Sequence, residues 1–237
     1  HPNAAALREY GGTHVIAKFN LKTWEDLGLV DKEGEPISAN HGKGLRSSLC
    51  MFACESIGGQ VNAALPSAAA VELIHNFSLI HDDIQDGDTE RRHRPTVWSI
   101  WGQSHAISAG NSLCSIAHHT LLDLSGEGIP DEIVLELSAI LTDRYLEMIE
   151  GQYMDLSFEQ RLDVTVAEYL DMISRKTGTL IEAAMHMGAF IATRDKATSI
   201  QFGQFGRLLG VAFQIRDDVL GIWGETSATG KATGADI

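Results

Sequence analysis

Long segments in which apolar residues recur at helical spacing constrain the fold of this chain most. The five prolines fall at candidate helix starts or in loops, and convincing period-two alternation is absent. We expect Pro66 to open one helix, because proline suits a first helical turn. The expected helices span residues 45–57, 66–84, 98–124, 132–156, 166–173, 180–192 and 200–223. The pattern predicts a single all-α domain of long helices, with no internal repeat.

The charge balance is strongly acidic, with a net charge of −14 from 32 acidic and 18 basic residues. Nucleic acid and anionic membranes attract basic surfaces, so neither is expected as the main partner. We expect no transmembrane segment, because no apolar stretch approaches the ~20 residues that a spanning helix needs. No basic-then-apolar signal segment opens the chain. Cys50, Cys54 and Cys114 are interpreted as small buried thiols in a reducing cytoplasm.

A first acidic cluster ends the expected helix 66–84, where Asp82 and Asp86 are four residues apart and share a face. His75 and Ser78 fall in the same stripe, whereas Phe77 lies on the opposite, apolar face. Carboxylates ~6 Å apart repel by roughly 3 kcal/mol at an effective dielectric of ~20, unless a cation joins them. Oxygen ligands without cysteine favour Mg²⁺, which takes one or two carboxylates plus substrate phosphate. A solvated acidic face is the alternative interpretation of a single cluster of this kind.

A second acidic cluster lies in the expected helix 200–223. Gln214, Asp217, Asp218 and Gly221 follow the i, i+3, i+4, i+7 spacing of one helical face. Two helices with facing carboxylates could hold divalent ions that neutralise a diphosphate and help it leave.

Basic residues gather in short clusters in this acidic chain. Lys43 and Arg46 flank a glycine turn at a helix start, where backbone amides also attract phosphate. Further cations follow the first acidic cluster and precede later helices, at positions Arg91, Arg92, Arg94, Lys176 and Lys231. Each alone is interpreted as a surface charge. Taken with the two acidic clusters, they indicate a site for two anions and a bridging metal.

From about residue 30 onward, the sequence resembles the trans-isoprenyl diphosphate synthases, or polyprenyl synthetase family. The motifs that carry the resemblance follow one another as Gly42-Lys43 with Arg46, Glu72 to His75 before Asp82 to Asp86, Arg91-Arg92 with Arg94-Pro95-Thr96, Glu150-Gly151-Gln152 with Asp155, Lys176-Thr177-Gly178, Phe213-Gln214 with Asp217-Asp218, and Gly230-Lys231. The resemblance implies antiparallel helices around a central cavity. It also implies Mg²⁺-assisted condensation of isopentenyl diphosphate with an allylic diphosphate.

The resemblance implies roles at the matching positions only. Asp82, Asp86 and Asp217 would bind Mg²⁺. The allylic diphosphate would contact Arg91, Lys176 and Lys231, and isopentenyl diphosphate would contact Lys43, Arg46, His75 and Arg92. Thr177 and Gln214 would line the reacting region.

Three departures from the family pattern stand out. Gly221 replaces an aspartate that often ends the second motif, and His93 stands where glycine is usual. The family also continues well beyond its Gly-Lys pair. We therefore expect residues 1–237 to form a single domain that lacks the family's C-terminal portion.

Two residues before the first acidic cluster bear on product length. Phe77 resembles the aromatic floor of short- and medium-chain enzymes, and the small Ser78 leaves room for a growing tail. We expect a twenty-carbon product, with fifteen carbons next.

A cytoplasmic homodimer that pairs through residues 98–124 is also expected. A non-catalytic partner subunit and a class I terpene cyclase remain as alternatives.

Overall fold

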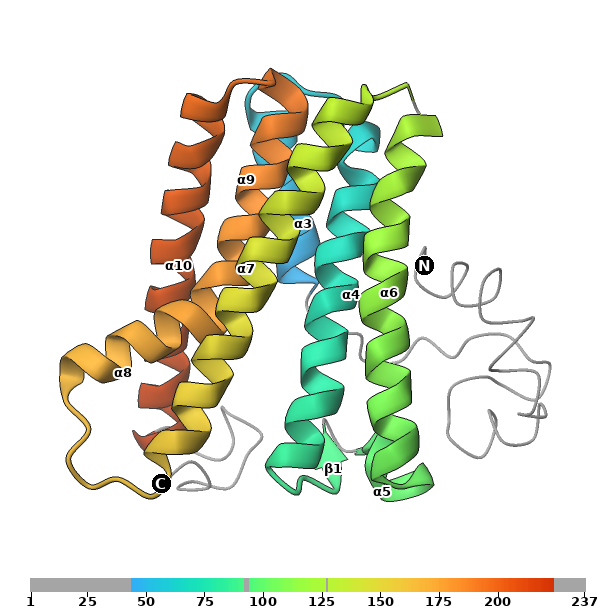
Figure 1. The fold of residues 1–237 in the computed structure, drawn as a ribbon. Coiled ribbons are helices and arrows are strands. Elements are labelled where there is room, and N and C mark those ends of the chain that lie inside the picture. Colours follow the sequence, from blue (N-terminus) through green and yellow to red (C-terminus); the bar gives the residue numbers. More distant parts are fainter. Residues whose placement is uncertain (1–43, 92–93, 127, 224–237) are drawn as a thin grey trace.

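The computed structural model describes residues 44–91, 94–126 and 128–223, and this part of the chain is almost entirely helical (Figure 1). The helices are α3 (Leu45–Ser56), α4 (Val61–Gln85), α5 (Val97–Trp101), α6 (Gln103–Gly126), α7 (Asp131–Phe158), α8 (Val166–Ile173), the π-helical turn η2 (Ser174–Gly178), α9 (Thr179–Thr193) and α10 (Lys196–Trp223). A two-stranded antiparallel hairpin joins β1 (Glu90–Arg91) to β2 (Arg94–Pro95). Lys43, Arg92, His93 and Lys231 lie outside the described residues.

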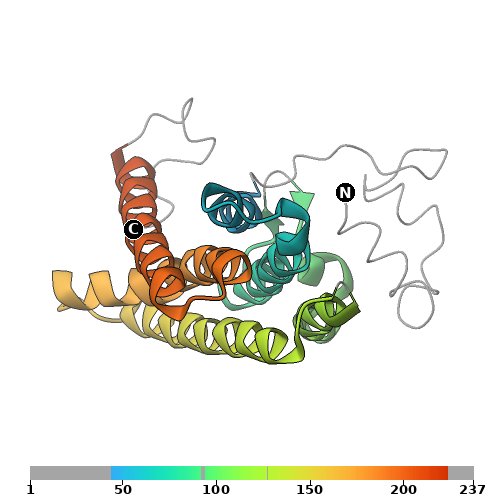
Figure 2. The same cartoon turned by 90° about the horizontal axis from the view of Figure 1, so that it is seen from above.

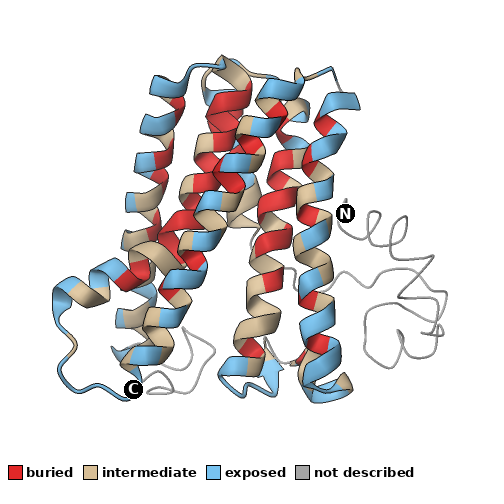
Figure 3. Ribbon diagram, in the orientation of Figure 1, coloured by how far each residue is buried: buried red, intermediate tan, exposed pale blue. Residues whose placement is uncertain are grey.

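The long helices stand side by side, and α8 projects from one edge (Figure 1). Viewed from above, α4 and α9 lie between α3 on one side and α7 on the other (Figure 2). The core gathers along these two inner helices and the faces that pack on them (Figure 3). Fully buried side chains include Ile74, Leu121, Leu141, Leu180 and Met187. The predicted all-α bundle is therefore confirmed, whereas the central cavity stays a prediction.

The start of α4 corrects one expectation. The helix begins at Val61, so Pro66 lies inside it instead of opening it. Residues 61–65 contain two alanines and no helix breaker, so nothing prevents an earlier start. A proline near a helix start removes one backbone hydrogen bond, which the packing of α4 tolerates.

The predicted helix 98–124 is two helices, because the chain turns at Gly102 with φ 83°. A positive φ of this size costs glycine little and other residues much. A single glycine inside an apolar periodic segment does not by itself reveal such a break. The two-residue strands of the hairpin were likewise not predicted, since they are too short to show alternation.

The helix α4 is long and apolar enough to cross a membrane by length and composition, with a mean hydropathy of 1.3 over its most apolar window. Length and composition alone do not show that a helix spans a membrane, so the expectation of no transmembrane segment stays a prediction. The neighbours α3, α6 and α9 pack against α4, and 44% of that window is buried inside the protein. This position is that of a core helix, which meets the same criteria without spanning anything.

Candidate functional site

The C-terminal end of α4 brings two predicted metal ligands beside a predicted phosphate ligand. Burial raises the pKa of Asp82 to about 6, against the partial compensation of the nearby Lys176 ammonium and with a further rise from Asp86. Burial also raises the pKa of Asp86, and Lys176 again opposes the shift. Asp82, Asp86 and Lys176 therefore share one electrostatic environment, as the sequence predicted.

A third acidic residue, Asp155 on α7, holds the lysine in place. Its Oδ2 lies 2.5 Å from Lys176 Nζ. Next to this pair, Gln152 Nε2 donates to Gln85 Oε1 at 3.0 Å and so ties α7 to the end of α4. Asp155 belongs to a motif noted in the sequence, but its pairing with Lys176 was not predicted.

Arg91 folds back from the hairpin onto α4. Its Nε donates to Asp83 Oδ1 at 2.6 Å, and Asp83 is only 4% exposed. Arg91 also lowers the pKa of Asp82, so its charge reaches the acidic site. The sequence did not single out Asp83, because it lies off the predicted stripe of Asp82 and Asp86. Its burial now explains how the hairpin is anchored.

A chain of hydrogen bonds joins η2 to α10 and α8. Thr177 Oγ1 donates to Gln214 Oε1 at 2.8 Å, and Gln214 Nε2 donates to Asp218 Oδ1 at 2.8 Å. Tyr169 on α8 donates its hydroxyl to Asp218 Oδ2 at 2.5 Å. The predicted pair Thr177 and Gln214 is therefore in direct contact, whereas the role of Tyr169 was missed.

Asp217 is placed differently from the other predicted metal ligands. Its side chain is 45% exposed, and it pairs with the neighbouring Arg216, whose Nη1 lies 3.9 Å from Asp217 Oδ1. Its role as a metal ligand stays a prediction.

The lysine and threonine of the site stand on the π-helical turn η2. Such turns are rare and occur often at functional sites. A Cβ atom on Gly151 would lie 2.3 Å from the backbone nitrogen of Lys176, so only glycine lets α7 approach so closely. On the other side, a Cβ atom on Gly210 would lie 2.7 Å from Gly178 Cα. Glycines on α7 and α10 therefore allow both helices to pack directly against η2.

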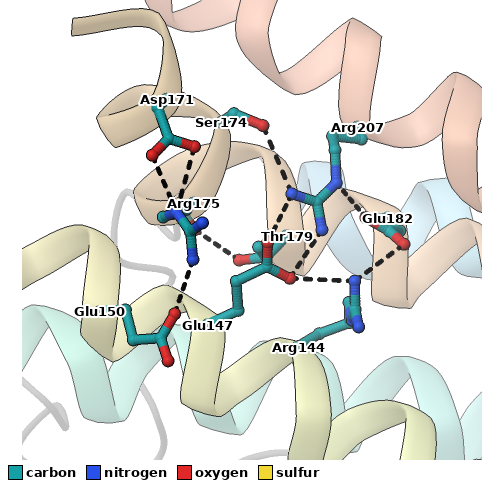
Figure 4. Close-up of polar contacts among 9 residues, drawn as sticks. All are labelled: Arg144, Glu147, Glu150, Asp171, Ser174, Arg175, Thr179, Glu182 and Arg207. Atoms are coloured by element: carbon teal, nitrogen blue, oxygen red, sulfur yellow. Dashed lines mark hydrogen bonds and ion pairs between the residues drawn. The ribbon is translucent and has the colours of Figure 1, made fainter. Parts of the chain in front are cut away.

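An ion-pair network supports η2 from behind (Figure 4). Arg207 on α10 forms a fork with Glu147 on α7 at 2.8 and 2.7 Å, and its Nε pairs with Glu182 on α9. Arg144 Nη1 bridges the same two glutamates at 2.9 and 3.2 Å. The bond with Arg207 holds the pKa of Glu147 below its usual range.

A second branch of the network reaches η2 itself. Arg175 pairs with Glu150 on α7 at 2.6 Å and with Asp171 on α8 at 3.1 Å. The pairs that join different long helices are 25 to 60 residues apart in the sequence, which is why the sequence did not reveal this network.

The remaining predicted ligands lie on α3 and α4. Arg46 is in the first turn of α3, and His75 and Ser78 are half-buried on α4. Ser78 Oγ donates to the backbone oxygen of His75 at 2.9 Å. Phe77 is buried and makes edge contacts with Tyr145 at 5.6 Å and with His81 at 4.6 Å between ring centroids.

The donor set fits a magnesium ion that arrives with its anion. Among the described residues, no group of three or more His, Cys, Asp or Glu could hold a metal alone. The oxygens of Asp82 and Asp86 supply the one or two carboxylates that Mg²⁺ usually takes from protein, and phosphate oxygens and water complete its shell. The raised pKa of Asp82 shows that its negative charge is not fully compensated within the protein.

The fold and the site define a class of all-helical proteins that gather carboxylates and a lysine where the ends of packed helices meet. The chain belongs to the polyprenyl synthetase family, because the Polyprenyl synthetase family model matches residues 29–237. Two proteins of Mycobacterium tuberculosis are similar over 211 residues, or 89% of this chain: a (2E,6E)-farnesyl diphosphate synthase with 42% identity and a geranylgeranyl diphosphate synthase with 40% identity. The chain covers 57% and 59% of these relatives' length.

Solved structures agree with the family assignment. A polyprenyl synthetase from Streptomyces coelicolor has a TM-score of 0.84 and 38% identity, with 98% of this chain and 66% of that chain covered. A polyprenyl synthase from Caulobacter crescentus, complexed with calcium and isoprenyl diphosphate, has a TM-score of 0.73 and 33% identity, with 84% and 58% covered.

Proposed function

We propose that this protein is a trans-prenyltransferase that condenses isopentenyl diphosphate with an allylic diphosphate, head to tail, in the presence of Mg²⁺. The observation that carries the proposal is the meeting of Asp82, Asp86 and Lys176 where α4, α7 and η2 converge. Relatives named farnesyl and geranylgeranyl diphosphate synthases support the substrate class.

The proposed roles divide the site between the two substrates. Asp82, Asp86 and Asp217 hold Mg²⁺, which supplies positive charge to the leaving diphosphate. Lys176, Arg91 and Lys231 bind the allylic diphosphate, whereas Lys43, Arg46, His75 and Arg92 bind isopentenyl diphosphate. Thr177 and Gln214 border the reacting carbon atoms. The surrounding helices exclude water from this region.

The proposed reaction begins with cleavage of the allylic carbon–oxygen bond. The electron pair leaves with the diphosphate, and the isopentenyl double bond attacks the resulting allylic cation to form the new carbon–carbon bond. Loss of one proton, with the released diphosphate as base, restores a double bond. Lys176 stabilises the charge on the departing diphosphate, as preorganised cations do in such sites.

Product length belongs to the proposal. We favour a twenty-carbon product and place fifteen carbons next, and relatives of both kinds are about equally similar. Phe77 would form the floor of the tail pocket, with Ser78 beside it. The contact of Phe77 with Tyr145 supports a closed floor, because an edge-to-face pair resists displacement.

The direct experiment incubates the purified protein with Mg²⁺, isopentenyl diphosphate and dimethylallyl, geranyl or farnesyl diphosphate in turn, and measures product length. We expect geranylgeranyl diphosphate to accumulate. A Phe77→Ala variant should release longer products, and unchanged products would count against Phe77 as the floor.

Other outcomes of the same experiment separate the rival functions. Condensation that appears only after a second subunit is added would identify a non-catalytic partner. A cyclic hydrocarbon formed from geranylgeranyl diphosphate alone would identify a cyclase.

We further propose that residues 1–237 act as one domain within a cytoplasmic homodimer. The helix α6 stands at one edge of the bundle (Figure 1), which supports its assignment to the subunit interface. Its outward stripe includes exposed Ser104, Ser108, Asn111 and Ser115. These small side chains would let a second copy approach closely.

A further inference from the structure

We propose that Tyr169 is a positioning residue, whose hydroxyl fixes Asp218 and thereby orients Gln214 and Thr177 toward the reacting substrates. This inference rests on the proposed prenyltransferase function and assigns a role to a residue outside the motifs described above.

The segment formed by α8 and η2 touches α10 at two points. Tyr169 bonds to Asp218 at 2.5 Å, and eight residues later Thr177 bonds to Gln214 at 2.8 Å. Gln214 and Asp218 are one helical turn apart on α10 and bond to each other at 2.8 Å. The two contacts therefore close a ring through three elements, and neither side chain of α10 can rotate without breaking a bond.

The direction of each hydrogen bond follows from its partner. Burial, followed by the neighbouring Asp218 carboxylate, raises the pKa of Tyr169, so the phenol stays protonated and donates. Asp218 then accepts from Tyr169 with one oxygen and from the Gln214 amide with the other. This fixes the Gln214 carbonyl oxygen toward Thr177, whose hydroxyl must donate to it. The proton positions at the reacting region are thus set by Tyr169.

The ring also separates the roles of the two neighbouring aspartates. Both oxygens of Asp218 are occupied by protein donors, whereas Asp217 is exposed. We infer that Asp218 serves orientation, which leaves Asp217 as the candidate metal ligand of this helix.

The first test compares Tyr169→Phe with Tyr153→Phe, a matched control because Tyr153 is 73% exposed on α7. We expect kcat to fall about tenfold in Tyr169→Phe, since a bond to a charged acceptor is lost. The KM for each substrate should change less than about twofold, because Tyr169 binds neither diphosphate. The control should retain the wild-type kcat. A kcat in Tyr169→Phe no lower than in the control, or a loss confined to KM, would overturn the inference.

The second test exchanges the amide group of Gln214 and the carboxylate of Asp218 between their two positions. Gln214→Glu alone places two carboxylates together and breaks the bond between positions 214 and 218, and Asp218→Asn is added to it to form a double variant. The double variant restores every bond, because the new amide at position 218 can donate to the new carboxylate at position 214 and still accept from Tyr169. We expect the double variant to recover most of the kcat that Gln214→Glu alone loses. No recovery, together with a shifted Mg²⁺ dependence, would show instead that Asp218 binds the metal.

Thermal unfolding needs no enzymatic activity, so it separates failure of this inference from failure of the proposed function. If the wild-type protein forms no condensation product, the function fails, but the ring can still be tested by thermal unfolding. Tyr169→Phe should lower the Tm of the wild type more than it lowers the Tm of Gln214→Ala, since coupled residues are not additive. Additive shifts in Tm would contradict the ring.

Discussion

At the scale of single residues, Asp82 is the group of the site whose ionised form is most clearly destabilised by burial. Its carboxylate is buried at the end of α4, and its pKa rises to about 6 from the ordinary 3.8 despite Lys176. The folded protein therefore binds this proton more tightly than the unfolded chain does. Without metal, the contribution of Asp82 to stability is greatest below pH 4 and declines as the pH rises toward 6.

This shift predicts the behaviour of Asp82→Asn. Without metal at pH 7.5, the variant should exceed the wild type in free energy of unfolding by up to about 3 kcal/mol, and the difference should vanish near pH 4. Urea unfolding at several pH values measures it. With Mg²⁺ and diphosphate at saturating concentrations, the wild type should instead have the larger free energy of unfolding, because only the wild type binds both. The exposed Asp143→Asn serves as control, and an equal gain in that variant would contradict the assignment.

Part of the site could be predicted from residue types and spacing. Asp82 and Asp86 share a helical face, and Thr177 and Gln214 belong to recognisable motifs. Their partners could not be predicted in the same way. Asp155 lies 21 residues from Lys176, and Tyr169 lies 49 residues from Asp218. Contacts over such separations depend on how helices pack, which local periodicity does not determine.

At the scale of elements, the approach of α7 to η2 depends on Gly151. An alanine there would place its Cβ 2.3 Å from the Lys176 nitrogen and push η2 away. We predict that Gly151→Ala destabilises the fold by about 1–3 kcal/mol, as overpacking usually does. Thermal unfolding checks this prediction against Gly126→Ala, where no atom lies within 4 Å of the new Cβ. The control should be neutral or more stable, since alanine favours helix.

The Arg207 network joins α7, α9 and α10 behind the site. Arg207→Gln would remove one of the two cations, Arg207 and Arg144, that Glu147 and Glu182 share. We predict a loss of about 2–4 kcal/mol in the free energy of unfolding at pH 7, as expected for breaking a partly buried pair. As the pH falls from 4.5 through the lowered pKa of Glu147, the deficit should shrink, because Glu147 becomes protonated.

A surface network provides the control for Arg207. Arg161 pairs with exposed Asp163 and with Glu168, so Arg161→Gln should lower stability much less than Arg207→Gln does. If denaturant unfolding gave similar losses for both variants, the Arg207 network would contribute no more than a surface pair.

The helices themselves were predicted more completely than their connections. The segment 166–173 matches α8 at both ends, and α9 and α10 extend the predicted ranges by a few residues. The break at Gly102 was missed, because the apolar periodicity of residues 98–124 continues across it. Residues 174–179 were left between two predicted helices, so the π-helical turn η2 was not predicted. They are fixed by backbone conformation and packing, and η2 carries the lysine and threonine of the site.

At the scale of the whole molecule, the proposed homodimer predicts a single species of twice the 25.7 kDa chain mass in sedimentation experiments. Ser115→Arg on the outward face of α6 should shift the protein toward monomer, since the symmetric interface would bring two added charges together. Gln204→Arg adds the same charge on the exposed face of α10 and should leave the dimer intact. Dissociation by both variants, or by neither, would exclude α6 as the interface.

The central claim is that the carboxylates of Asp82 and Asp86 and the ammonium of Lys176 together bind a diphosphate through Mg²⁺. Calorimetric titration of geranyl diphosphate into the wild-type protein, with and without Mg²⁺, tests it most directly. We predict that binding requires Mg²⁺, is lost in Asp82→Asn and weakens about a hundredfold in Lys176→Gln. Lys196→Gln, which removes an exposed lysine paired with Glu136, should bind as the wild type does. Equal binding without Mg²⁺, or undiminished binding in Asp82→Asn, would contradict the account.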